Sequence, residues 1–179
     1  MGLKLNLGCA RDIRPHSDGW INADLNRGPG ADICFDAGKV WPFPANYLSH
    51  IHASHILEHI EKKHLTTCMK EANRCLKPGG TFEIRVPFGP IGTFCNDEPQ
   101  HEIAFAPTSL NPYCQGNGQN TSLDYDWEDP LFKMELCEVV RIFWQRGRLE
   151  PWLGDWISRR YTRPKIGIPV EIHWRLARP

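Results

Sequence analysis

Two short apolar segments near the N-terminus each end on a residue suited to holding a nucleoside. The segment 3–7 stops at Gly8, and the segment 20–24 stops at Asp24. A glycine at the end of a parallel strand lets a ligand approach the backbone, and a carboxylate ending the neighbouring strand can accept both hydroxyls of a ribose. The pair predicts a nucleoside pocket beyond the carboxyl ends of the strands. Alternatively, Gly8 opens a turn and Asp24 caps a helix.

A second group of reactive side chains follows another apolar segment, at residues 54–59. It contains His55, Glu58 and His59. A histidine with a pKa of about 6.5 can accept a proton from an attacking hydroxyl or amine. His55 is the better candidate, because Glu58 and His59 could instead set the start of a following helix.

The same residues fit His-x-x-Glu-His, an inverted zinc-peptidase pattern. That pattern requires both histidines on one face of a long helix, and His55 is expected where a strand ends. The zinc metallopeptidase is kept as a distant alternative, and no metal site is predicted.

Bringing these residues together requires a parallel sheet. Strand-like segments bounded by turn formers occur at residues 3–8, 20–24, 32–35, 48–54 and 81–87. Between the fourth and fifth segments, apolar residues at helical spacing and a terminating Lys-Pro-Gly-Gly predict a helix at 61–76. Strand, helix and strand in this order form a crossover unit.

The second half of the chain predicts long loops and a closing hairpin. Residues 88–132 are rich in proline, glycine, asparagine and aspartate, with a short helical candidate near 107–113. Segments 133–145 and 169–177 look like strands, and 150–161 could form an amphipathic helix. The expected fold class is α/β: a seven-stranded Rossmann-like sheet, parallel with one antiparallel strand at the C-terminal hairpin, and helices on both faces.

Composition limits the class of protein. The chain has 179 residues, of which 41% are hydrophobic and 23% charged, as expected for a globular protein of about one domain. Lysine plus arginine equals aspartate plus glutamate at 21 each, which disfavours nucleic acid and anionic membrane as partners. Seven cysteines, an odd number without a Cys-x-x-Cys pair, predict reduced thiols and a cytoplasmic location.

The first crossover narrows the choice of ligand. A dinucleotide pocket needs several glycines and a helix N-terminus to receive a pyrophosphate. After Gly8, the next strand begins at Trp20, too soon for a full crossover helix. S-adenosylmethionine consists of adenosine, a sulfonium and an amino acid tail; without phosphates, it would not require that helix.

Five fragments carry a family resemblance: Leu-Asn-Leu-Gly-Cys-Ala at 5–10, Gly-Trp-Ile-Asn-Ala-Asp at 19–24, Trp-Pro-Phe-Pro at 41–44, Ser-His-Ile-Leu-Glu-His at 54–59 and Leu-Lys-Pro-Gly-Gly at 76–80. In this order they resemble the class I S-adenosylmethionine-dependent methyltransferases. More narrowly, they resemble the small predicted methyltransferases in which the first crossover helix is cut short. The resemblance covers about residues 3–88 and continues more weakly through 101–110.

The resemblance implies a set of cofactor contacts. Gly8 and its neighbours would lie against the amino acid tail, Asp24 would take the ribose hydroxyls, and Asp36 with Ala37 would lie by the adenine. Asp36 could instead cap a turn before Gly38. The full set of expected cofactor-binding residues is Gly8, Cys9, Ala10, Asp24, Leu25, Asp36, Ala37 and Ser54.

One residue departs from the family pattern. The family usually has glycine at the position of Ala10, and alanine adds a methyl group and resists positive φ. Either the loop runs differently or cofactor affinity is reduced. An inactive S-adenosylmethionine-binding regulatory or structural relative therefore stays open as an alternative.

The acceptor side is expected near His55 and in the loop after the fifth strand. His101 there resembles the family's histidine before a Phe and a Ser-Leu pair, although a structural role would also explain it. Trp127, Trp152 and Trp156 could line an aromatic pocket, pack in the core or form a homodimer surface.

The expected function is methyl transfer to an oxygen or nitrogen of a small molecule or a protein side chain. Within one domain spanning 1–179, residues 1–88 would form the cofactor-binding half. Residues 89–179 would supply the acceptor loops and the closing hairpin.

Overall fold

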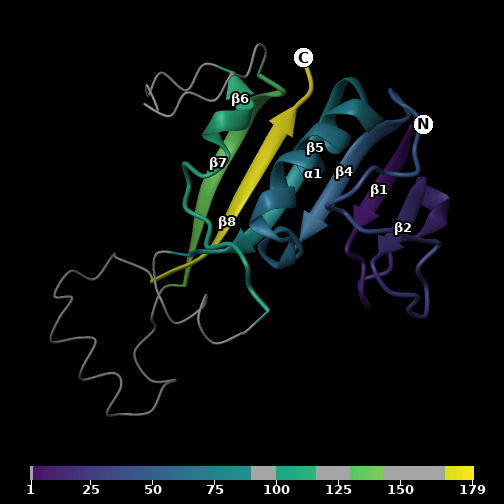
Figure 1. Cartoon of the computed structure of the whole chain (residues 1–179), viewed down its shortest axis with the longest axis horizontal. Coiled ribbons are helices and arrows are strands. Elements are labelled where there is room, and N and C mark those ends of the chain that lie inside the picture. Colours follow the sequence, from purple (N-terminus) through teal and green to yellow (C-terminus); the bar gives the residue numbers. More distant parts are fainter. Residues whose placement is uncertain (1, 90–99, 116–129, 143–167) are drawn as a thin grey trace, which may run out of the picture.

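The computed structural model describes residues 2–89, 100–115, 130–142 and 168–179, whose strands form one mixed sheet (Figure 1). The sheet order is β3-β2-β1-β4-β5-β8-β7-β6. Its strands are β1 (Leu3–Leu7), β2 (Trp20–Asp24), β3 (Ile33–Cys34), β4 (Leu48–Ser54), β5 (Leu76–Pro87), β6 (Cys114–Gln115), β7 (Phe132–Ile142) and β8 (Ile168–Ala177). The helical segments are α1 (Leu65–Cys75) and the 3-10 turns η1 (His16–Asp18), η2 (Leu57–His59), η3 (Lys62–His64) and η4 (Asn111–Tyr113).

The strand directions confirm the predicted Rossmann-like α/β architecture. Strands β1 to β5 pair in parallel, and β8 lies antiparallel between β5 and β7. The predicted count of seven strands is corrected to eight by β6, which pairs in parallel with β7. Because β6 has only two residues, it carries no alternation from which a strand could be predicted.

Helix α1 covers the apolar face of the sheet. Its buried residues are Leu65, Cys68, Met69, Ala72 and Cys75 together with Glu71. Alternate residues of the central strands, such as Leu5, Ile51, Phe82 and Trp174, are fully buried in the same core. Alternation with a period of two places them on one side of the sheet, which leaves their polar neighbours on the other.

The boundaries of α1 and β5 differ from the prediction. The helix begins at Leu65 because the preceding three residues form η3. Strand β5 begins directly at Leu76 and continues through the Lys-Pro-Gly-Gly segment, with a register shift against β4. Gly79 in that segment has a φ of +74°, a conformation that favours glycine and lets the strand bulge there.

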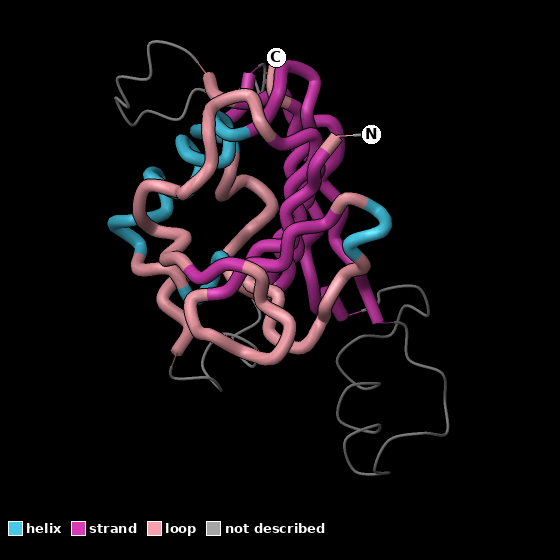
Figure 2. Tube along the Cα trace, turned by 90° about the vertical axis from the view of Figure 1, so that its right-hand side faces the viewer, coloured by secondary structure: helices cyan, strands magenta, loops and turns pink. Residues whose placement is uncertain are grey.

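The second face of the sheet departs from the expected helices on both faces. Figure 2 shows α1 on one side of the sheet and only η1 on the other, within the described residues. The connection from β1 to β2 is too short for a crossover helix, and its loop instead packs Arg14 over the Trp20 ring, 4.5 Å from the ring centroid. This loop covers the polar side chains of Asn6 and Asn22, which are buried and donate to the carbonyls of Asp12 and Arg14.

Some expectations fall outside the described residues. These are the helix at 150–161 and the positions of Trp127, Trp152 and Trp156. The division of the chain into two functional halves stays a prediction. No helix among the described residues combines the length and hydrophobicity needed to cross a membrane.

Candidate functional site

A cleft of about 620 Å³ opens at the carboxyl ends of β1, β2 and β4. The predicted site residues that line it are Gly8, Ala10, Asp24, Leu25, Asp36, Ala37 and His55. Cys9, Ser54 and His101 were predicted too, but they do not line it. The fold thus brings together residues at or after the ends of four strands, β1 to β4, as expected for parallel sheets.

The loop after β1 explains the need for glycine at position 8. Gly8 has a φ of +69°, and a Cβ at this position would lie 2.5 Å from Cδ1 of Ile56. The neighbouring Cys9 donates its N–H to the carbonyl of Ala23 at 2.9 Å, and its side chain is buried. Burial also raises the pKa of the Cys9 thiol. Cys9 therefore fastens β1 to β2, and position 8 requires glycine because Ile56 fills the place that a Cβ would take.

The carboxylate of Asp24 organises the same loop. Oδ2 accepts the N–H of Ala10 at 2.9 Å, and Oδ1 accepts the N–H of Asn26 at 3.1 Å. Each carboxylate oxygen has two acceptor sites, so both oxygens can still accept a ligand hydroxyl. Ala10 itself has a φ of +42°, which is strained for alanine. The loop therefore runs in the conformation for which glycine is better suited.

Asp36 both caps a turn and lines the cleft. Its Oδ1 accepts the N–H of Gly38 at 2.9 Å, and Oδ2 lies 3.3 Å from Nζ of Lys39. The Gly38 N–H, with help from Lys39, lowers the pKa of Asp36, so the carboxylate is ionised at neutral pH. The adjacent Ala37 carbonyl accepts the indole N–H of the buried Trp41 at 3.0 Å, which anchors this wall of the cleft in the core.

His55 lies between two carboxylates. Its Nε2 is 2.8 Å from Oε1 of Glu171, and its Nδ1 is 3.3 Å from Oε1 of Glu58. Glu58 above all, with Glu171, raises the pKa of His55 against the effect of burial. Since both nitrogens face carboxylates, the ring favours the imidazolium form. It can act as a proton acceptor only after losing that proton.

The backbone at His55 is strained as well. Its φ is +53°, a left-handed conformation that costs a non-glycine residue about 1 kcal/mol or more. Gly8, Ala10 and His55 are thus three left-handed residues on one cleft. Such strain tends to cluster at functional sites.

His101 lies behind the cleft wall. Its ring centroid is 4.7 Å from that of His59, which does line the cleft. The backbone N–H of Glu102 donates to the carbonyl of Glu58 at 2.7 Å and so ties this loop to η2. His101 is therefore next to a residue of the cleft without lining the cleft itself.

Glu58 is an unusual buried carboxylate. It is 1% exposed, and neither of its side-chain oxygens has a hydrogen-bond partner among the described residues. The carboxylate forms an ion pair with His55. Glu58, His59 and His101 each offer one metal-ligand atom within 4.8 Å of the others. The inverted peptidase pattern is not formed, because His55 follows β4 and the other two residues sit in the three-residue η2.

Sequence reasoning missed several residues of the cleft. Glu61, His64 and Gln100 line it without belonging to any predicted group. Glu171 reaches His55 from β8, at a sequence separation of 116 residues. One signal in the sequence pointed to Glu171: it alternates with His173 on a predicted strand. This spacing indicates that the two residues share a face of the sheet, but it does not indicate that Glu171 pairs with His55.

The charges of the cleft favour a cationic ligand over a phosphate. The carboxylates of Asp24, Asp36 and Glu61 line it. Its other ionisable residues are His55, His59 and His64, and no lysine or arginine is among the described lining residues. Phosphate sites usually offer arginine, lysine or a helix N-terminus.

Comparisons with known proteins relate the chain to methyltransferases. Residues 12–84 match the sequence family described as a methyltransferase domain. No curated protein matches the chain.

Among solved structures, a SAM-dependent methyltransferase from Archaeoglobus fulgidus has a TM-score of 0.63 at 16% identity, covering 99% of this chain and 86% of that chain. The geranyl diphosphate C-methyltransferase from Streptomyces coelicolor, solved with Mg²⁺, geranyl diphosphate and S-adenosyl-L-homocysteine, has a TM-score of 0.60 at 11% identity, covering 100% and 71%. The cyclase SpnF has a TM-score of 0.57 at 17% identity, covering 99% and 75%. At these identities, the likeness establishes the fold. Together, the match over residues 12–84 and the shared fold support a relationship between this chain and the class I S-adenosylmethionine-dependent methyltransferases.

Proposed function

We propose that the protein binds S-adenosylmethionine in the cleft and transfers its methyl group to an oxygen or nitrogen acceptor. The observation that carries the proposal is the convergence of Gly8, Asp24 and Asp36 on one cleft of about 620 Å³. This volume is within the range of roughly 300–1,000 Å³ typical of small-molecule sites. The acceptor class is a small molecule or a protein side chain.

The residues present fit the cofactor. Gly8 lines the cleft without a side chain, so the amino acid tail can approach its backbone. Asp24 accepts the ribose hydroxyls with the lone pairs that its loop contacts leave free. Asp36 and Ala37 flank the adenine on the next strand end. Leu25 supplies apolar contact, since it is exposed beside Asp24.

The cofactor supplies an electrophilic methyl group on a sulfonium, so the protein's main task is to position donor and acceptor in line. The carboxylates of Asp24, Asp36 and Glu61 complement a ligand whose net charge is positive. His55 at the cleft rim orients the acceptor and, once deprotonated, takes its proton. Glu58 and Glu171 set the fraction of His55 that is deprotonated.

A second candidate function is cofactor binding without methyl transfer. The strained Ala10 and the occupied nitrogens of His55 favour it. SpnF, a cyclase by name, has the same fold, so the fold alone does not select methyl transfer.

Isothermal titration with S-adenosylmethionine and S-adenosylhomocysteine tests the binding step, and both functions predict binding of both compounds. Turnover separates the two functions. The protein is incubated with S-adenosylmethionine and either the small-molecule or the protein fraction of a cell lysate, and the release of S-adenosylhomocysteine is measured. Only a methyltransferase should release it faster than the Asp24→Asn variant does. Absence of binding at millimolar concentration would remove both functions.

A further inference from the structure

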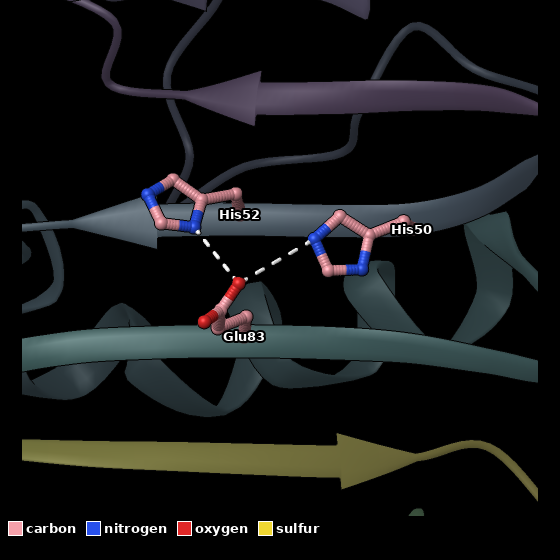
Figure 3. A group of neighbouring side chains, drawn as sticks. All are labelled: His50, His52 and Glu83. Carbon is pink, nitrogen blue, oxygen red and sulfur yellow. Dashed lines mark hydrogen bonds and ion pairs between the residues drawn. The ribbon is translucent and has the colours of Figure 1, made fainter.

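Three potential metal ligands lie on the face of the sheet that α1 does not cover. His50 and His52 are alternate residues of β4, and Glu83 is on the neighbouring β5 (Figure 3). The register pairs His52 with Glu83 and His50 with Thr81. Because strand side chains alternate, both imidazoles point to the same side as the Glu83 carboxylate. This group is separate from the cofactor cleft, which none of the three lines.

The ligand atoms have nearly the spacing that zinc requires. Nδ1 of His52 is 3.3 Å from Oε2 of Glu83, and Nε2 of His50 is 3.8 Å from the same oxygen. All three ligand atoms lie within 4.8 Å of one another. Tetrahedral zinc with ligands at about 2.0–2.1 Å holds them about 3.3–3.4 Å apart. The two nitrogen–oxygen distances are close to this spacing, and the two imidazole nitrogens, no more than 4.8 Å apart, would move closer together around one ion.

Outer contacts hold the ligands in the required orientation. Nδ1 of His50 is hydrogen-bonded to Oγ1 of Thr81 at 2.7 Å, which leaves Nε2 directed at Glu83. The other oxygen of Glu83, Oε1, lies 3.5 Å from Nη2 of Arg85, so Oε2 remains for the cluster. Partners of this kind fix ring tautomers and carboxylate orientation in metal sites.

The imidazoles are also in the protonation state that metal binding needs. Burial lowers the pKa of His50 to about 4 and also lowers the pKa of His52, so both rings are neutral at neutral pH. Glu83, with its lowered pKa, is ionised through its contacts with His52, Arg85 and His50. The nearby cations Lys4, Arg14 and Arg85 repel a metal ion, so the carboxylate is essential to the charge balance.

We propose that His50, His52 and Glu83 bind one divalent transition-metal ion of the zinc class. The ion joins β4 to β5, and water occupies its fourth position. Two imidazoles and a carboxylate form a recognised zinc ligand set. The side chains of His50 and Glu83 are 21% and 25% exposed, which gives the ion a path from solvent. The site fastens β4, whose end carries His55, and so stabilises one wall of the cleft.

The test is a zinc titration of the full chain after treatment with a chelator, with a competing chromophoric chelator to measure affinity. We expect one high-affinity zinc ion per chain and a rise in Tm on zinc addition, with no comparable rise for magnesium, which prefers oxygen ligands. His50→Gln and Glu83→Gln should each weaken zinc binding at least about tenfold. Both residues are partly exposed, so these variants are expected to fold, which circular dichroism without metal checks.

Two control variants separate this site from other zinc ligands. His101→Gln alters the group formed with Glu58 and His59, and a Cys34→Ser, Cys137→Ser double variant removes the two exposed thiols among the described residues. Both should bind zinc as the unaltered protein does. Binding of less than one ion per chain would overturn the proposal. So would unchanged affinity in the folded His50→Gln and Glu83→Gln variants, or a loss of affinity confined to either control.

Discussion

The backbone N–H of Ala10 donates a 2.9 Å hydrogen bond to the carboxylate of Asp24. Through this contact, the end of β2 holds the loop after β1 in a left-handed conformation that alanine adopts with strain. One carboxylate therefore shapes the cleft and faces it. If the cleft binds S-adenosylmethionine as proposed, a change at either residue should affect both binding and local stability.

We expect Asp24→Asn to weaken S-adenosylmethionine binding about 10- to 100-fold, because hydrogen bonds to a charged group contribute about 1.5–3 kcal/mol. Isothermal titration measures the change. Asp18→Asn is the matched control, since Asp18 is exposed in η1 and lies outside the cleft. Equal affinities for Asp24→Asn and the unaltered protein would refute the ribose role of Asp24.

Ala10→Gly should stabilise the protein by roughly 1 kcal/mol, because glycine adopts a φ of +42° without the Cβ penalty. Thermal or urea unfolding measures the gain. Ala45→Gly is the control: Ala45 is exposed and lacks a positive φ, so the change should destabilise by about 0.5–1 kcal/mol. If Ala10→Gly lowered the free energy of unfolding as much as Ala45→Gly does, the backbone at Ala10 would not be strained.

Gly8→Ala should destabilise the protein and weaken cofactor binding, because the added methyl group meets Ile56 and the φ is +69°. Gly79→Ala has nearly the same strain at a φ of +74°, but a Cβ there meets nothing within 4 Å. The control should cost about 1–2 kcal/mol and leave binding unchanged. Similar losses of binding in both variants would show that the close approach at Gly8 is unimportant.

We expect the ion pairs of His55 to make a pH-dependent contribution to the free energy of unfolding. Its folded-state pKa is raised by Glu58 and Glu171, so its ion pairs stabilise the fold fully below the unfolded pKa of about 6.5. That contribution is lost as the pH rises through the higher folded pKa. Glu171→Gln should therefore lower the NMR-measured pKa of His55 and destabilise the protein more at pH 5.5 than at pH 8.5.

The control for this prediction is Glu135→Gln, because Glu135 is exposed on β7, a strand that does not pair with β4. It should leave the pKa of His55 unchanged. A His55 titration that is the same in the Glu171→Gln variant and the unaltered protein would exclude the proposed ion pair.

The parallel core and the cleft were largely predictable from the sequence. Gly8, Asp24 and Asp36 each follow an apolar segment, and the carboxyl ends of parallel strands meet at one edge. The helix α1 was predicted because its apolar residues repeat at helical spacing.

Other features depend on tertiary contacts without a local pattern. The pairing of His55 with Glu171 requires β8 to insert antiparallel beside β5, and nothing near either residue encodes that partner. Cys9 was expected in the cleft, but its side chain packs into the core because it alternates with Gly8. The His50, His52 and Glu83 group depends on the register of two strands, which periodicity alone does not fix.

A crystal structure of the protein with S-adenosylhomocysteine tests the central claim most directly. We expect the ligand in the cleft, with both ribose hydroxyls hydrogen-bonded to Asp24, the adenine beside Asp36 and the amino acid tail against Gly8. A ligand bound elsewhere, or a cleft that stays empty at saturating ligand, would contradict the account.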